Sequence, residues 1–147
     1  MSKAFTKESD DLPDSPIRRR GIPVPELNLV TPAGLAAARA ELEHLVRTGG
    51  DPDRVRELTD HLATAQAADP PVDRTQVALG ATVTLVDDDG NRYVYRIVGA
   101  IESDPKSGKL GWQSPLAQAL WGAKVGDAVA LPRAGGAIDA EIERVDY

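Results

Sequence analysis

Two aspartates beside a predicted turn are the side chains in this sequence best suited to bind a divalent cation. Asp51 and Asp53 directly follow Gly49 and Gly50. Carboxylate oxygens are the ligands that Mg²⁺ prefers, and a cation held by two of them can activate an attacking water. A second interpretation makes Asp51 the cap of a helix that starts at Pro52 and Asp53 an acid favoured by the helix dipole. We prefer the second interpretation, which leaves the two aspartates as secondary candidates for metal binding.

The other side chains with catalytic or metal-binding potential are few. His44 and His61 are the only histidines, one in each half of a predicted helical hairpin. They could share a metal ion, but we expect partly exposed side chains on the helix flanks, because the spacing supplies no carboxylate partner. Ser114 has no histidine near it in the sequence, so we expect it to cap a helix and not to act as a nucleophile. The absence of cysteine excludes disulfides and thiolate metal sites.

Two short helices position these residues. Thr31 and Asp51 are predicted N-caps, and each is followed by a proline at the first helical position. Apolar residues then recur at intervals of three, four and three, the spacing of a packing seam. The seam residues are Leu35, Ala38, Leu42 and Leu45 in the first helix and Val55, Leu58, Leu62 and Ala65 in the second. With a Gly-Gly turn between them, the helices are expected to pair antiparallel over residues 29–68, with arms about 22 Å long.

From residue 79 the hydrophobic period changes to that of a strand. Residues 81–85 alternate in polarity, Gly90 lies in a hairpin turn, and Tyr93 and Tyr95 share one face of the returning strand, where we expect them to join the core. Later residues supply further strands and one short helix. The sequence therefore predicts an α+β protein, in which an antiparallel sheet with one small helix spans residues 79–147.

The remaining segments are predicted to lack regular structure. Residues 69–78 contain a double proline and are expected to form a linker. Residues 1–28 are rich in charge and proline, include the arginines at positions 18–20, and are expected to be a disordered tail.

Composition excludes several classes of protein. The formal net charge is −6, which argues against a protein that coats DNA with a broad basic face. The 41% hydrophobic and 27% charged residues are typical of a globular protein of one or two small domains. No apolar run approaches the roughly 20 residues needed to cross a bilayer, and the N-terminus lacks the apolar core of a signal peptide. We therefore expect a cytoplasmic protein without a membrane partner.

Residues 110–127 are the most distinctive stretch of the chain. Ser114 and Pro115 begin the short helix, Gly122 ends it, and the segment closes with Val125-Gly126-Asp127 before the next strand. The order of residues through this strand end, helix and turn is distinctive.

The sequence of residues 110–127 resembles the signature of the bacterial Gre transcript cleavage factors, GreA and GreB. That signature reads Ser-Pro-Leu-Ala…Leu…Gly…Val-Gly-Asp. Residues 95–99 and 140–142 resemble the neighbouring strands of that family. The resemblance covers residues 79–147 closely and residues 29–67 more loosely. It implies a C-terminal domain folded like the FK506-binding prolyl isomerases (FKBP-like) and binding to RNA polymerase at its secondary channel. The polymerase-docking residues implied by the match are Ser114, Pro115, Leu116, Gly122, Lys124, Val125, Gly126 and Asp127.

In this family the hairpin tip lends carboxylates to a Mg²⁺ ion at the polymerase active centre, so the catalytic site belongs to the polymerase. The resemblance therefore implies no enzymatic activity and no cofactor of its own, at most Mg²⁺ shared with RNA polymerase. The protein would contact nucleic acid only indirectly, within the elongation complex. The present tip departs from the family pattern: it reads Thr48-Gly49-Gly50-Asp51-Pro52-Asp53, it lacks the family's Ser-Glu-Asn, and the arms are shorter. We expect weak or no stimulation of RNA cleavage.

The sequence leaves three alternatives open. Short-armed relatives such as the regulator of nucleoside diphosphate kinase bind polymerase without a cleavage-stimulating tip. A prolyl isomerase would need an aromatic-lined pocket built from Tyr93, Tyr95, Trp112, Trp121 and Tyr147, some of which the core must use; we expect no such activity. Trp112 and Trp121 lie on either side of the short helix. They would either form an exposed contact for polymerase or belong to the core. The third alternative is a helical-hairpin adaptor for another protein.

Overall fold

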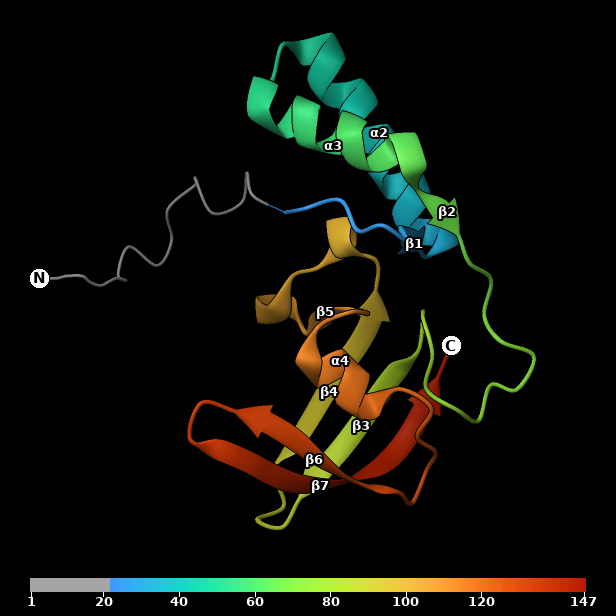
Figure 1. Ribbon diagram of the computed structural model, residues 1–147, viewed down its shortest axis with the longest axis vertical. Helices are drawn as coiled ribbons and strands as arrows, with labels where there is room; N and C mark the ends of the chain where they lie inside the picture. The colour runs from blue at the N-terminus through green and yellow to red at the C-terminus, as the bar shows by residue number, and fades with distance from the viewer. Residues whose placement is uncertain (1–21) are drawn as a thin grey trace, which may run out of the picture.

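The computed structural model describes residues 22–147, and the arginines at positions 18–20 lie outside this range. A helical hairpin is followed by a β-rich domain, and the hairpin projects away from the sheet (Figure 1). The architecture is α+β, as the hydrophobic periods predict. Within residues 22–147, no helix is both long enough and apolar enough to cross a membrane.

The helical hairpin contains two helices and a two-residue strand at each end. These elements are β1 (Leu29–Val30), α2 (Pro32–Thr48), α3 (Pro52–Thr64) and β2 (Gln66–Ala67). The predicted seam forms: Ala38 and Leu58 are buried between the helices, and every other seam residue except Val55 packs against this cluster. β1 and β2 pair in parallel and close the open end of the hairpin.

The helix boundaries follow from local chemistry. Thr31 Oγ1 accepts a hydrogen bond from the Gly34 N–H at 2.9 Å, and Asp51 Oδ1 accepts one from the Asp53 N–H at 2.9 Å, so both predicted N-caps form. Gly49 ends α2 with a φ of 68°, a left-handed conformation in which a side chain would be strained.

The β-rich domain is a five-stranded sheet in the order β5-β4-β3-β7-β6. Its elements are β3 (Thr82–Asp87), β4 (Arg92–Val98), the short 3₁₀ turns η1 (Ala100–Glu102) and η2 (Pro105–Ser107), β5 (Lys109–Gly111), α4 (Pro115–Leu120), β6 (Ala128–Arg133) and β7 (Gly136–Asp146). The prediction of an antiparallel sheet is wrong at one edge, because β5 pairs in parallel with β4. The two 3₁₀ turns carry the chain back along the sheet before β5 begins, so the strand cannot form a hairpin with β4.

One apolar core fills the domain. Alternate residues of β3 and β7 are buried, and α4 adds Ala117 and Leu120, both fully buried in the same cluster as Leu131 of β6. Tyr93 and Tyr95 are half-buried and pack against this core, as predicted. The core therefore determines the position of α4 on the sheet.

Two segments predicted to lack regular structure hold buried residues. Asn28 is fully buried, and its Nδ2 donates to the His61 carbonyl at 2.8 Å, so the predicted tail already belongs to the hairpin at this position. Val77, assigned to the linker, is 1% exposed, accepts a hydrogen bond from the Gly122 N–H at 2.8 Å, and so belongs to the core. Both contacts join residues far apart in the sequence.

The carboxylate of Glu102 joins the hairpin to the β-rich domain, beside Ile101, which is buried in the apolar cluster of the hairpin. Glu102 Oε2 accepts hydrogen bonds from the Thr31 N–H at 3.0 Å and the Gly99 N–H at 2.9 Å, and Glu102 Oε1 accepts one from Thr31 Oγ1 at 2.6 Å. A Cβ at Gly34 would lie 2.0 Å from the Glu102 carboxyl group. The first turn of α2 therefore approaches Glu102 closely only because residue 34 is glycine.

Replacing Gly34 with alanine should show this constraint through its dependence on Glu102. In the wild-type background, Gly34→Ala should lower the free energy of unfolding by about 1–2 kcal/mol, because Glu102 must move and lose charge-assisted hydrogen bonds. In a Glu102→Ala background the same change should stabilise the protein by up to about 1 kcal/mol, because alanine favours helix. Urea unfolding of the four variants measures this double-mutant cycle, and additive effects would contradict the joint.

Candidate functional site

The α4 segment is held in place by its own hydrogen bonds. Ser114 Oγ accepts from the Ala117 N–H at 3.3 Å, which places Ser114 as the predicted N-cap, with Pro115 at the first helical position. The Gln118 side chain donates to the Trp112 carbonyl at 2.7 Å and ties the helix to the preceding chain. Leu116 is half-buried against the core. Ser114 thus has a structural partner within its own helix.

The glycines and aspartate after α4 shape the following loop. Gly122 and Gly126 have φ values of 81° and 93°, left-handed conformations that favour glycine. The Gly126 N–H donates to the Ile142 carbonyl at 2.8 Å, and Asp127 Oδ2 accepts from the Lys124 N–H at 2.9 Å. These predicted docking residues therefore fix the loop conformation.

Other residues of the same loop supply its exposed surface. Trp121 and Val125 are 41% and 58% exposed, and Lys124 is also exposed. We call Trp121, Lys124 and Val125 the α4 loop surface. The Trp121 ring lies 6.1 Å from the half-buried Trp112 ring at an angle of 48°, so the exposed indole rests on a second aromatic residue. Aromatic residues on a rigid support are frequent anchors of protein interfaces.

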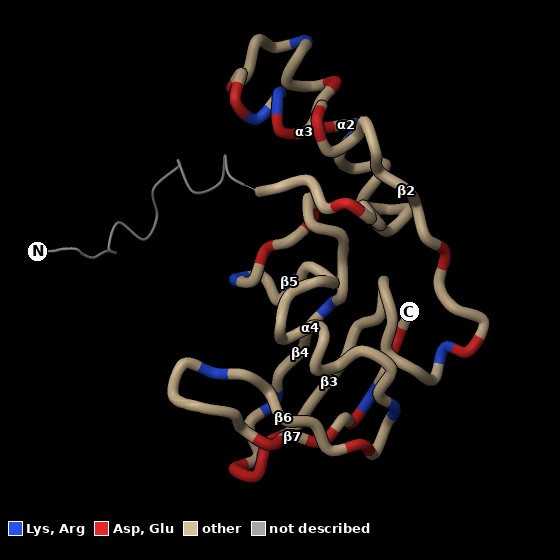
Figure 2. Tube along the Cα trace, viewed as in Figure 1, with Lys and Arg blue, Asp and Glu red and all other residues tan. Residues whose placement is uncertain are grey.

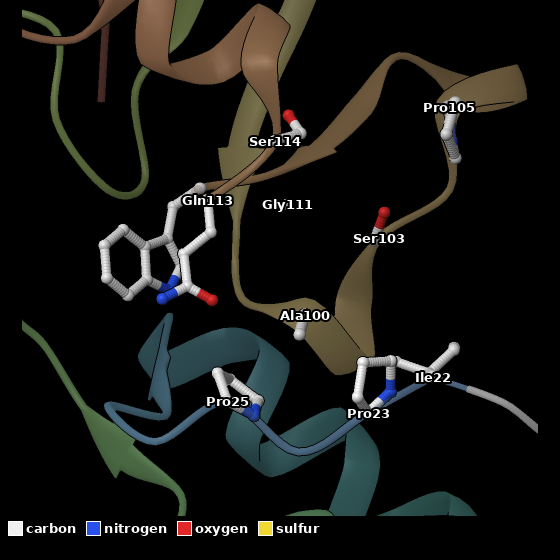
Figure 3. A pocket seen from close by; sticks show the side chains of 10 residues that line it. Ile22, Pro23, Pro25, Ala100, Ser103, Pro105, Gly111, Gln113 and Ser114 are labelled. Atoms are coloured by element: carbon white, nitrogen blue, oxygen red, sulfur yellow. The ribbon is translucent and has the colours of Figure 1, made fainter.

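A cavity of about 560 Å³ lies between the start of the described chain and the segment that leads into α4 (Figure 3). Ile22, Pro23 and Pro25 line one side, and Ala100 and Ser114 are among the residues on the other. Trp112 is the one aromatic residue among the described residues that line it, and its buried Nε1 has no hydrogen-bond acceptor among them.

Tyr93 and Tyr95, two of the residues considered for a proline pocket, do not line this cavity. Tyr93 and Tyr95 stack with ring centroids 6.4 Å apart, and the Arg133 guanidinium lies 4.9 Å from the Tyr93 centroid. Tyr93 donates its hydroxyl proton to Asp87 at 2.9 Å, and this hydrogen bond raises the pKa of Tyr93. The structure thus does not bring these aromatic residues together with Trp112 around one cavity.

Both candidate carboxylates at the hairpin tip have partners. Asp51 caps α3, and Asp53 Oδ1 accepts a hydrogen bond from Arg56 Nη1 at 3.2 Å. Acidic and basic residues both lie at the outer end of the hairpin (Figure 2). Across residues 22–147, no three His, Cys, Asp or Glu side chains are grouped so that they could hold a metal ion. The geometry favours the capping interpretation of the two aspartates.

The prediction of partly exposed histidines is wrong for His61. This residue is 1% exposed, and its Nε2 donates to the Ile22 carbonyl at 3.1 Å. His44 is exposed, as expected. Because Arg54 faces Glu41 across the antiparallel hairpin, His61 lies beside the start of α2 while His44 lies near its end. Along the helix axis the two are separated by about 15 Å, so they cannot share a metal. The burial depends on residues 22–28, which the sequence assigned to the tail.

One ion-pair cluster links the two arms of the hairpin. Arg54 donates from Nε and Nη2 to the two carboxylate oxygens of Glu41, both at 2.8 Å, and from Nη1 to Glu57 at 2.6 Å. This bidentate contact holds the pKa of Glu41 below its ordinary value and raises that of Arg54. Sequence spacing did not reveal this pair, because its partners belong to different helices.

Comparison with known proteins gives consistent matches. Residues 72–147 match the family model for the C-terminal part of the transcription elongation factors GreA and GreB. The transcription elongation factor GreA of Bradyrhizobium sp. (strain BTAi1) is 40% identical over 113 residues, which cover 76% of this chain and 68% of the relative. The GreA of Mesorhizobium japonicum is 44% identical over 96 residues, which cover 64% of this chain and 61% of that protein.

Two solved structures are also similar. A prokaryotic transcription elongation factor GreA/GreB from Nitrosomonas europaea is 24% identical, with 82% of this chain and 99% of that chain covered and a TM-score of 0.47. The GreA factor homolog 1 of Thermus thermophilus is 22% identical, with 78% of this chain and 86% of that chain covered and a TM-score of 0.47.

The Arg54–Glu41 contact should make the stability of the hairpin depend on pH. Because the pKa of Glu41 is lower in the folded state, its stabilising effect is complete above the ordinary glutamate pKa and is lost as the pH falls through the folded value. Glu41→Gln should therefore lower the melting temperature by a few degrees at neutral pH and have little effect at an acidic pH below the folded-state pKa of Glu41.

Thermal unfolding followed by circular dichroism at both pH values measures the effect. Glu43→Gln is the matched control, because Glu43 approaches Arg47 only at 4.0 Å and is 79% exposed. An equal loss of stability in the two variants would contradict a specific role for Glu41.

Proposed function

Since the chain belongs to the GreA/GreB family of transcription elongation factors, we propose that it binds bacterial RNA polymerase at the secondary channel, with its β-rich domain as the anchor. The observation that carries this proposal is the segment from Ser114 to Asp127. It resembles the family signature, it lies within the matched residues 72–147, and its buried residues support the α4 loop surface. A preformed apolar surface loses little conformational freedom on binding.

The predicted docking residues divide into two roles under this proposal. Ser114, Gly122, Gly126 and Asp127 fix the backbone, while the exposed side chains of the α4 loop surface, together with exposed Pro115, contact the polymerase. Half-buried Leu116 joins the helix to the core. Docking therefore depends on the first group only through the shape of the loop.

The hairpin would then extend into the channel without delivering a metal ligand. α2 has 17 residues and is about 25 Å long, and the carboxylates at its tip are held by a helix cap and by Arg56. We propose a factor that regulates elongation without strong stimulation of RNA cleavage, as in the short-armed relatives. It would have no catalytic residue or cofactor of its own, would meet nucleic acid only through the elongation complex, and would act in the cytoplasm.

Polar substitution of the α4 loop surface tests the docking proposal. Trp121→Ser combined with Val125→Ser should weaken binding to core RNA polymerase by at least about tenfold, because the apolar contact area is removed. Biolayer interferometry with immobilised polymerase measures the affinity. The melting temperature should fall only modestly, because Val125 is 58% exposed and Trp121 loses only its contact with the Trp112 ring.

Val94→Ser is the matched control. Val94 is 57% exposed, close to the value for Val125, but it lies on β4. Binding that falls equally in the control and the double variant, or wild-type protein that fails to bind at micromolar concentration, would refute the docking surface.

Cleavage of stalled transcripts tests the second half of the proposal. Added to backtracked elongation complexes with Mg²⁺, the wild-type protein should release little or no 3′ RNA, because its tip carboxylates are already engaged. Gel analysis of end-labelled RNA measures this, with an established cleavage factor as positive control. Efficient cleavage that disappears with Asp51→Ala or Asp53→Ala would show that these residues are metal ligands after all.

A further inference from the structure

A second cavity, separate from the α4 loop surface, lies between the hairpin and the sheet. Its volume is about 330 Å³. Along α2 it is lined by small residues and by Glu41, on α3 by Arg54, and across from them by residues of β4, η1 and β5, Glu102 among them. The residues from α2 include Ala33, Gly34, Ala37 and Ala38, and those opposite include Arg96 and Lys109. The small side chains of α2 leave space beside two cations.

These two cations are direct neighbours. Arg96 on β4 is the register partner of Lys109 on the parallel strand β5, so their side chains emerge side by side, about 4.8 Å apart at the backbone. Neither forms an ion pair with another described residue. Like charges on directly opposed positions of a sheet repel each other, and an anion between these two exposed side chains would relieve that repulsion. The arrangement therefore provides a place for a negatively charged ligand.

The carboxylates near this cation pair are engaged with other groups. Glu41 accepts both of its hydrogen bonds from Arg54. Glu102 accepts three donors at the joint between hairpin and sheet. Asp104, whose backbone is bonded to that of Lys109, accepts a hydrogen bond from Ser107 Oγ at 2.8 Å. No carboxylate of the described residues thus neutralises the two cations by direct contact.

We propose that this cavity binds a small anion through its phosphate group, with Arg96 and Lys109 as the ligand-binding residues. A guanidinium donates two parallel hydrogen bonds to phosphate oxygens, and an ammonium adds a third donor. The volume is at the lower end of the range for small-molecule sites. Among residues 22–147 no aromatic side chain lines the cavity, so these residues offer a nucleobase nothing to stack on, and recognition rests on the phosphate. The chemistry suits pyrophosphate or a terminal phosphate monoester.

Titration of the full chain with inorganic pyrophosphate tests the proposal. Isothermal titration calorimetry should show saturable binding to the wild-type protein, weakened at least about tenfold by Arg96→Gln combined with Lys109→Gln. The matched control, Arg92→Gln combined with Arg144→Gln, removes the same charge elsewhere on the sheet, where both arginines have acidic partners. Equal weakening in both variants, or no saturation at millimolar pyrophosphate, would overturn the site.

Stability gives an independent measurement that does not depend on the calorimetry. In buffer without phosphate, the Arg96→Gln and Lys109→Gln double variant should melt at or above the wild-type temperature, because a like-charge contact has been removed. Pyrophosphate should raise the melting temperature of the wild type and not of the double variant. A double variant that melts clearly lower would show a structural role for the pair and refute the assignment.

Competition distinguishes the source of the phosphate. Adenosine 5′-monophosphate should displace pyrophosphate and adenosine should not, because only the former carries the recognised group. Amide shifts in nuclear magnetic resonance spectra of the wild type should centre on Gly34, Ala37 and Lys109. Shifts confined to other parts of the protein, or an RNA oligonucleotide without a terminal phosphate that binds more tightly than pyrophosphate, would overturn the assignment to a small anion.

Discussion

The carboxylate of Glu102 fixes the relation between the two parts of this protein. It accepts the backbone and hydroxyl protons of Thr31, which caps α2, and the backbone proton of Gly99, where β4 ends. One charged group therefore satisfies donors from the hairpin and from the sheet at once. Charge-assisted hydrogen bonds of this kind are stronger and more directional than neutral ones, so the direction of the hairpin follows from this contact.

Close backbone approach makes that contact feasible. Gly34 leaves room for the Glu102 carboxyl group, and a Cβ at Gly99 would lie 2.6 Å from the Leu29 carbonyl oxygen. The cavity with Arg96 and Lys109 lies along the same junction. The packing of α2 on η1 thus determines both where the hairpin points and what space remains beneath it.

The signature segment shows how a binding surface can depend on residues that do not touch the partner. Ser114, Gly122, Gly126 and Asp127 are engaged in capping, in left-handed turns and in hydrogen bonds of the loop. Trp121 and Val125 are exposed on the outside of the loop that these four residues shape. Much of the sequence pattern in this segment specifies a backbone, and that backbone presents exposed side chains such as Trp121, Lys124 and Val125 to solvent.

The sequence by itself determined what depends on neighbours along the chain: the caps at Thr31, Asp51 and Ser114, the turn at Gly49, and the seam of the hairpin. Such features need only local hydrogen bonds and hydrophobic spacing. Tertiary structure decided the parallel pairing of β5, the burial of Asn28 and His61, the Arg54–Glu41 contact, and the joint at Glu102. Each of these brings together residues whose separation in the sequence carries no periodic signal, and only the packing of whole elements sets their distance in space.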